Sequence, residues 1–161
     1  MRIIKIIGAV LLAVLCCPEY CCGGAVQVQI TDCNLPEELP VILRAAERNN
    51  CIGDNFLILR AIRRAENGGP GREFGVLHPR CLAEIARRPK DSLDIQAGWA
   101  AATIVKNRLR WTAAGRPGEF IDFLGDKYCP ASVDAAGNKN WKANVKYFYR
   151  KFKNERIENK I

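Results

Sequence analysis

Hydrophobic side chains recur at intervals of three and four residues along most of this chain, the spacing that places them on one face of an α-helix. The clearest repeat lies near the C-terminus and consists of Trp141, Val145, Phe148 and Phe152. A longer helix is expected from about residue 91 to 110, and shorter ones at 39–50 and 119–124. No long run of alternating hydrophobic and polar residues, the pattern of a β-strand, interrupts them. The expected fold class is therefore mainly α.

The helix expected at residues 55–67 carries a carboxylate on its hydrophobic face. Leu59, Ile62 and Glu66 are spaced by three and four residues, so Glu66 falls on the buried stripe. Four glycines between positions 68 and 75 then end the helix and form a loop that lets a ligand approach the backbone closely. A small β excursion is allowed for in this glycine-rich loop. A carboxyl group at the edge of a core is partly desolvated, which raises its pKa and favours a role as proton donor.

The N-terminal segment has the features of an export signal. Arg2 and Lys5 precede an apolar run at 6–17 that is too short to span a bilayer comfortably. Small residues at 23–25 suit cleavage by signal peptidase, which would leave a chain that starts at Val26. We therefore expect an exported protein, periplasmic or extracellular.

Two alternatives to a cleaved signal stay open. Cys16 or Cys17 could carry a lipid that attaches the protein to a membrane, although the residue before each is bulky where a small one is favoured. The same segment could instead form a buried N-terminal helix.

The composition is that of a globular protein, with 48% hydrophobic and 26% charged residues, which excludes a wholly disordered chain. The net charge of +8 falls to +7 when a leader containing Arg2, Lys5 and Glu19 is removed. Such an excess suits a polyanionic partner: nucleic acid, an anionic membrane face or an acidic cell-wall polymer. Export argues against nucleic acid, so a nucleic-acid-binding protein is kept only as a rival interpretation.

Four cysteines remain after the leader, namely Cys33, Cys51, Cys81 and Cys129. An exported protein can form disulfides from them, and three connectivities are possible. A bridge from Cys33 to Cys51 is disfavoured, because the helix expected between them would hold the Cα atoms beyond the limit of about 7 Å. His78 is the one histidine of the chain, so neither a metal site nor another cofactor is expected.

Five stretches of the sequence together resemble a known group of enzymes. They are "RAIRRAENGG", "REFGVL", "LDIQAGWAAATIVKNRLRW", "FLGDKYCP" and "GNKNWKANVKYFYRKF". In this order they resemble the lysozyme-like superfamily, most closely the soluble lytic transglycosylase type, from about residue 54 to 152. The resemblance implies a lysozyme-like helical domain at 54–152, preceded by a signal peptide at 1–25 and an N-terminal segment with the first helix at 26–53, and followed by a charged tail at 153–161.

The resemblance also implies roles for individual residues. Glu66 matches the catalytic glutamate, and the substrate-binding positions would be Asn67, Gly75, Val76, Leu77 and Tyr128. The chain departs from the family pattern in three places. Asn67 stands where serine is usual, His78 where glutamine commonly follows the Gly-apolar-apolar segment, and Cys129 where a turn asparagine is usual.

The implied reaction cleaves peptidoglycan between N-acetylmuramic acid and N-acetylglucosamine. A single glutamate acts as acid and then as base, while the muramoyl 6-hydroxyl closes on the anomeric carbon, so neither water nor a cofactor is required. We expect a monomeric enzyme of this type. One rival is a lysozyme-type hydrolase, which would use a second carboxylate such as Glu73, Asp91 or Asp94. Glu73 is also a candidate substrate contact. Another rival is an inactive wall-binding protein with the same fold.

Overall fold

Six α-helices and one short 3-10 turn make up most of residues 35–158, the part of the chain described in this computed structural model. They are α1 (Leu35–Arg48), α2 (Asp54–Glu66), α3 (Pro79–Arg87), η1 (Pro89–Asp91), α4 (Ser92–Ala113), α5 (Phe120–Tyr128) and α6 (Ala135–Glu158). All lie in one compact unit, Cys33–Ile161. The mainly α class is confirmed. The β excursion allowed for in the glycine-rich loop is wrong, because that loop consists of turns without a strand.

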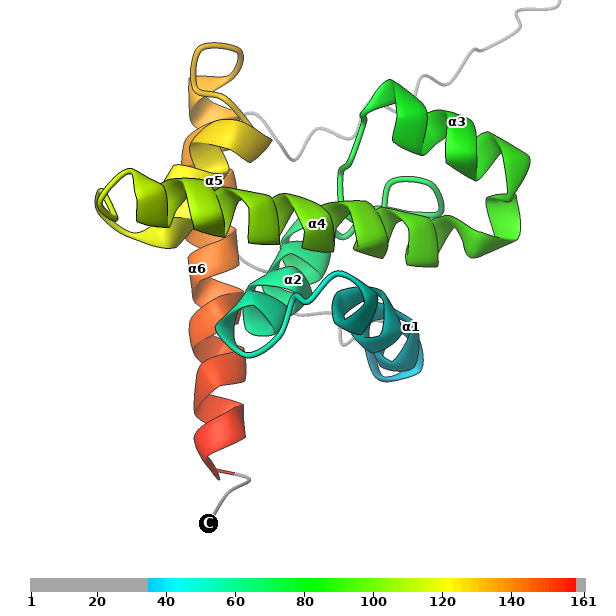
Figure 1. Ribbon diagram of the computed structural model, residues 1–161, viewed down its shortest axis with the longest axis horizontal. Coiled ribbons are helices and arrows are strands. Elements are labelled where there is room, and N and C mark those ends of the chain that lie inside the picture. The colour runs from blue at the N-terminus through cyan, green and yellow to red at the C-terminus, as the bar shows by residue number, and fades with distance from the viewer. Residues whose placement is uncertain (1–34, 159–161) are drawn as a thin grey trace, which may run out of the picture. The chain divides into compact units, whose positions relative to one another are not determined.

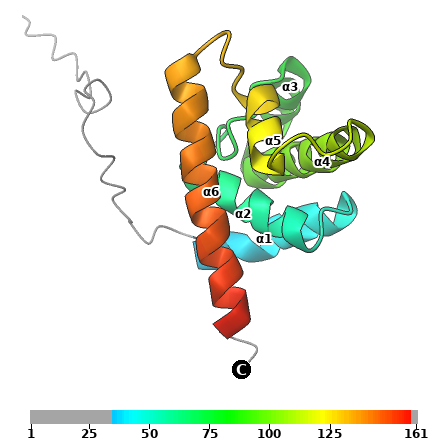
Figure 2. The same ribbon diagram turned by 90° about the vertical axis from the view of Figure 1, so that its left-hand side faces the viewer.

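Helix α2 packs against both long helices, α4 and α6, and so lies at the centre of the unit. In Figure 1 the long helices α4 and α6 run crosswise to each other, and Figure 2 shows α5 beside the N-terminal half of α6. Helices α1 and α3 both pack on α4. The side chains that α2 buries are Leu57, Ile58, Leu59, Ala61 and Ile62. This arrangement anchors α2 along its length and presents its C-terminal end, where Glu66 lies, to the glycine-rich loop.

The end of α2 is set by Asn67, one residue before the expected glycine. Asn67 has a φ of 43° and a ψ of 29°, the left-handed conformation, and its backbone N–H donates to the carbonyl of Arg63 at 3.2 Å. Asparagine is one of the few residues other than glycine that adopt this conformation routinely. The chain therefore turns away sharply right after Glu66.

Several helices differ from those expected, among them α1, which starts at Leu35 rather than at residue 39. The basic connector before residue 91 contains helix α3, which starts at Pro79 and is capped by the His78 Nδ1 atom accepting from the Arg80 N–H at 3.2 Å. Gly125 was expected to end α5, but it is buried inside that helix. The charged segment from 153 was expected as a tail, and it continues α6 as far as Glu158.

The expected disulfides are not formed by the cysteines that the structure describes. Cys51, Cys81 and Cys129 are all free thiols, on different elements, and Cys33 lies outside the described residues. Burial raises the pKa of Cys51 to about 12 and that of Cys81 to about 11. The chain therefore packs both as small, neutral, apolar side chains.

The predicted signal peptide and the candidate lipidated cysteines also fall outside the described residues. Among the helices at 35–158, none is both long enough and apolar enough to cross a membrane.

Candidate functional site

Glu66 is half-buried at the C-terminal end of α2, and its side chain meets α6. Its Oε1 atom accepts a hydrogen bond from the indole Nε1 of Trp141 at 2.7 Å, a contact that joins positions 75 residues apart. Burial raises the pKa of Glu66 above its ordinary value, and the hydrogen bond from Trp141 partly opposes this shift. The carboxyl group is thus biased toward its protonated form and is held in one orientation.

The glycine-rich loop passes against this carboxyl group at Gly75. The φ of Gly75 is 65°, and a Cβ atom built there would lie 2.5 Å from Oε2 of Glu66 and 2.9 Å from Oε1. The left-handed backbone favours glycine at this position, and any side chain there would displace the Glu66 carboxyl. The structure therefore brings together Glu66 and Gly75, two of the residues that the sequence indicated.

Tyr128, at the end of α5, completes this group. Its ring stacks on Trp141 with centroids 5.1 Å apart and 24° between the planes, and its hydroxyl donates to the carbonyl of Phe74 at 2.8 Å. Burial, followed by the charge of Glu66, raises the pKa of Tyr128 well above its usual value. The phenol therefore stays neutral, ties the loop to α5 and lies close enough to Glu66 to sense its charge.

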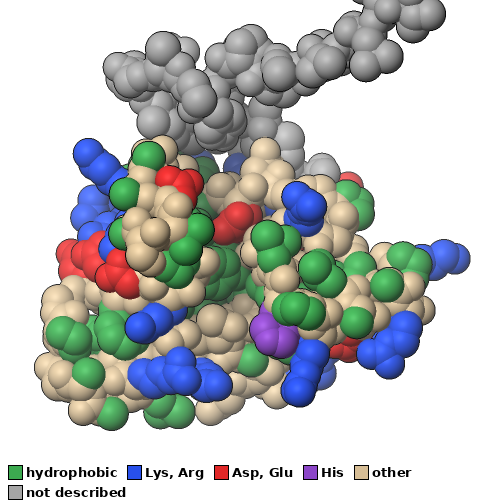
Figure 3. Space-filling model, turned by 90° about the horizontal axis from the view of Figure 1, so that it is seen from above, with side chains coloured by type: hydrophobic (Ala, Val, Ile, Leu, Met, Phe, Trp, Pro, Cys, Tyr) green, Lys and Arg blue, Asp and Glu red, His purple; other side chains and the backbone are tan. Residues whose placement is uncertain are grey.

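The surface is hollowed on the side where α3 and the α5–α6 turn stand, at the top of Figure 1. Figure 3 looks down on this side and shows a depression between two raised parts, with hydrophobic side chains and an acidic one inside it. Both basic and acidic side chains lie on the parts that border the depression. Such a depression can hold part of an extended ligand.

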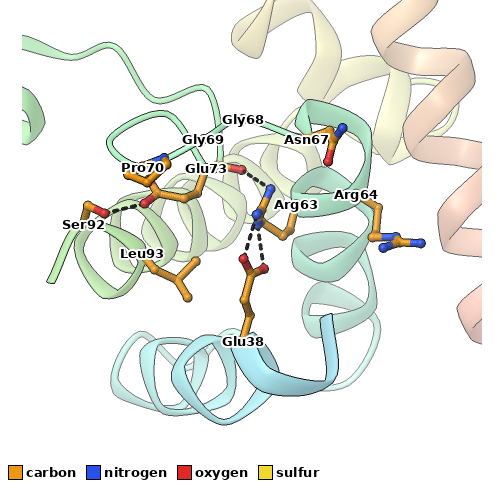
Figure 4. Close-up of a pocket in the computed structure, with 10 residues that line it drawn as sticks. All are labelled: Glu38, Arg63, Arg64, Asn67, Gly68, Gly69, Pro70, Glu73, Ser92 and Leu93. Carbon is orange, nitrogen blue, oxygen red and sulfur yellow. Dashed lines mark hydrogen bonds and ion pairs between the residues drawn. The ribbon is translucent and has the colours of Figure 1, made fainter. Parts of the chain in front are cut away.

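Glu73 and Asn67, two further predicted contacts, lie beside a different cavity, of about 440 Å³. Figure 4 shows this cavity bordered by α1, the end of α2, the loop and the start of α4. Glu73 is only 5% exposed, and its carboxylate accepts a hydrogen bond from the hydroxyl of Ser92. The Arg63 guanidinium also reaches its backbone carbonyl, at 3.4 Å. Glu73 thus anchors the loop to α4, and it is not placed with Glu66, Gly75 and Tyr128.

Val76 and Leu77, the remaining predicted contacts, follow Gly75 out of the core. Val76 is half-buried against the core, whereas the side chain of Leu77 is 58% exposed. His78 comes next and stacks on Trp99, with ring centroids 5.0 Å apart. The segment therefore leads from the Glu66 carboxyl to the exposed surface beside α3.

Gln96 on α4 holds the glycine-rich loop, a role that the sequence prediction missed. The side chain is fully buried; its oxygen accepts from the N–H groups of Phe74 and Val76, at 3.3 and 3.1 Å. Its nitrogen donates to the carbonyls of Gly71 and Val76, at 3.0 and 2.9 Å. A lone glutamine among the apolar residues of a buried helix face was the available signal, since a buried amide must find partners.

The candidate second carboxylates are engaged away from Glu66. Asp94 pairs with Arg48 at 2.7 Å, Asp91 lies 3.7 Å from the guanidinium of Arg88, and Glu73 bonds Ser92 as above. Trp141 was missed as a site residue because its place on the hydrophobic stripe indicated a core side chain. Its indole N–H was the available signal, because a buried indole needs an acceptor.

No family model, curated protein or solved structure matches the chain. Within residues 35–158, no three His, Cys, Asp or Glu side chains are grouped as metal ligands would be.

Glu66→Gln should stabilise the fold at neutral pH. Burial raises the pKa of Glu66 in the folded state above its value in the unfolded state. The contribution of Glu66 to the free energy of unfolding is therefore most favourable below the unfolded-state pKa, and it is lost as pH rises through the folded-state pKa. Glutamine does not ionise, so the free energy of unfolding of the variant, relative to wild type, should increase between about pH 4 and about pH 8. Urea unfolding at both pH values measures this. Glu47→Gln, on the exposed face of α1, is the control, and a pH-independent difference for Glu66→Gln would contradict the expectation.

Proposed function

We propose that this protein is an exported lytic transglycosylase that cleaves the glycosidic bond between N-acetylmuramic acid and N-acetylglucosamine in peptidoglycan. The observation that carries the proposal is the half-buried carboxyl of Glu66, with its raised pKa, held against Gly75 by the Trp141 indole. A protonated carboxylic acid in an apolar setting is the device by which glycosidases protonate a leaving group near neutral pH.

In the proposed reaction Glu66 serves twice. It first gives its proton to the glycosidic oxygen, and the C–O bond to the anomeric carbon breaks. The resulting carboxylate then takes the proton of the muramoyl 6-hydroxyl as that oxygen bonds to the anomeric carbon. Glu66 is thereby reprotonated, and no second carboxylate is needed. The engagement of Glu73, Asp91 and Asp94 elsewhere supports this reaction over direct hydrolysis.

Substrate contacts are proposed for the chain on either side of the acid. Gly75 leaves the backbone free of a side chain next to Glu66, and Leu77 offers an exposed apolar surface to a sugar ring. The Tyr128 hydroxyl donates its proton to the hydrogen bond with the carbonyl of Phe74. Its oxygen lone pairs can therefore accept a hydrogen bond from a sugar hydroxyl. The basic charge of the chain suits the anionic cell wall.

Digestion of purified peptidoglycan tests the proposal. The purified protein is incubated with cell-wall sacculi, and the released muropeptides are separated and weighed by mass spectrometry, with heat-inactivated protein as the control. Anhydro-muropeptides, lighter than hydrolysis products by one water molecule, are expected. Hydrated products would contradict the transglycosylase reaction and indicate a lysozyme-type hydrolase instead. The absence of any released product would overturn the enzymatic proposal.

A further inference from the structure

We propose that Trp141 selects the carboxyl oxygen of Glu66 that carries the proton, and thus acts as a positioning residue for the acid. The inference rests on the proposed function of Glu66. An indole N–H donates hydrogen bonds and cannot accept them. In a protonated carboxylic acid the carbonyl oxygen is the stronger acceptor, so the donor that faces Oε1 favours the arrangement in which Oε1 is the carbonyl and Oε2 carries the proton.

Oε2 is the oxygen placed closest to the glycine-rich loop. The site of a Cβ on Gly75 lies 2.5 Å from Oε2, against 2.9 Å from Oε1. Because Gly75 has no Cβ, the Glu66 carboxyl occupies that space and lies directly against the Gly75 backbone. Trp141 thus directs the acidic proton to the oxygen on the Gly75 side of the carboxyl group, away from the indole on α6.

The indole is itself held firmly. Trp141 is 9% exposed and is covered by the ring of Tyr128. The start of α6 is fixed by Asp134, which accepts from the N–H of Gly137 at 2.8 Å. Asn138, 6% exposed, donates to the carbonyls of Gly125 and Cys129, at 3.2 and 2.6 Å. The bonds of Asn138 connect α6 to α5, and so they fix the position of the Trp141 indole relative to Glu66.

The titratable groups around Glu66 have contacts of their own or are neutral near pH 7. Tyr128 from α5 and Cys129 just beyond it both sense the Glu66 charge, and burial raises the pKa of each, so both are neutral near pH 7. On α2 itself, Arg63 is engaged by Glu38 at 2.7 Å, and the Arg64 guanidinium lies over the Phe148 ring. In the loop, Glu73 is bonded to Ser92.

The variant Trp141→Phe tests the inference, since it keeps an aromatic ring against Tyr128 and removes the N–H. A hydrogen bond to the ionised carboxylate is lost, so the pKa of Glu66 should rise further, as followed by carbon-13 NMR of labelled glutamate side chains. In wall digestion, the alkaline limb of the kcat/KM profile should move up by the same amount, and kcat should fall about tenfold or more.

Trp111→Phe is the matched control, because it also removes an indole hydrogen bond, to the carbonyl of Pro117 at 3.3 Å, and should leave the Glu66 titration unchanged. If Trp141→Phe does not fold, benzothienylalanine at 141 retains the shape of the indole without its N–H. An unmoved Glu66 titration would overturn the positioning role. A wild type that releases no muropeptides, yet whose Glu66 titration moves in the variant, would support the contact and overturn the proposed function.

Discussion

Glu66→Gln should abolish release of muropeptides from peptidoglycan, with kcat/KM reduced by about two to four orders of magnitude. Glutamine fills the same volume and still offers an oxygen to the Trp141 N–H, so the fold and the contact at 2.7 Å should survive. The amide cannot release a proton to a leaving oxygen, and it cannot accept one from the 6-hydroxyl. Product masses and initial rates, measured at matched protein concentrations, give the comparison.

Glu47→Gln is the charge-matched control for this variant. Glu47 is exposed on α1, and its replacement removes the same single negative charge without touching the site. Its rate should equal that of wild type. If Glu66→Gln lysed walls as fast as Glu47→Gln, Glu66 would not be the acid, whatever its burial.

Gln96→Met should cause a large loss of stability. Methionine has nearly the shape of glutamine, but it cannot make the four hydrogen bonds that hold the loop at Gly71, Phe74 and Val76. Each buried backbone group left without a partner costs about 1–3 kcal/mol, and water will reach some of them, so we expect a loss of about 3–6 kcal/mol. That is a large share of the roughly 5–15 kcal/mol that stabilises a typical domain.

Asn107→Leu provides the comparison for Gln96→Met. Asn107 is also a buried amide of α4, 3% exposed, but it donates to the carbonyl of Thr103 in its own helix at 2.9 Å. Its loss should cost only about 1–2 kcal/mol. Urea unfolding of both variants measures the difference. Equal destabilisation by the two substitutions would show that the loop does not depend on Gln96.

The helices that the sequence predicted well are those whose burial is periodic. In α2, α4 and α6 the apolar repeat is long enough to identify both the helix and its inward face. Helix α3 buries one residue, Cys81, so it shows no periodic apolar face and its charged sequence indicated a connector. Gly125 was predicted to end a helix from its intrinsic preference, but tertiary packing against α6 keeps it inside α5.

Two kinds of signal pointed to the candidate site: local spacing indicated Glu66, and the resemblance to a known group of enzymes indicated Gly75 and Tyr128. The position of Glu66 at the end of a buried stripe followed from residues within two helical turns. The contact with Trp141 could not be predicted in this way, because periodicity assigns a side chain to one face of a helix but does not show which residues that face contacts. The same limit applies to Gln96, which reaches a loop 20 to 25 residues away, and to Glu73, whose burial depends on Ser92.

The contact between Glu66 and Trp141 has a consequence for the order in which the candidate site is assembled. Synthesis places α2 early and α6 last, so the acid exists long before the indole that orients it. Until α6 docks, that carboxyl group lacks the indole N–H that it accepts from in the folded protein. Under the function proposed for Glu66, the acid is therefore oriented only once α6 has packed against α2.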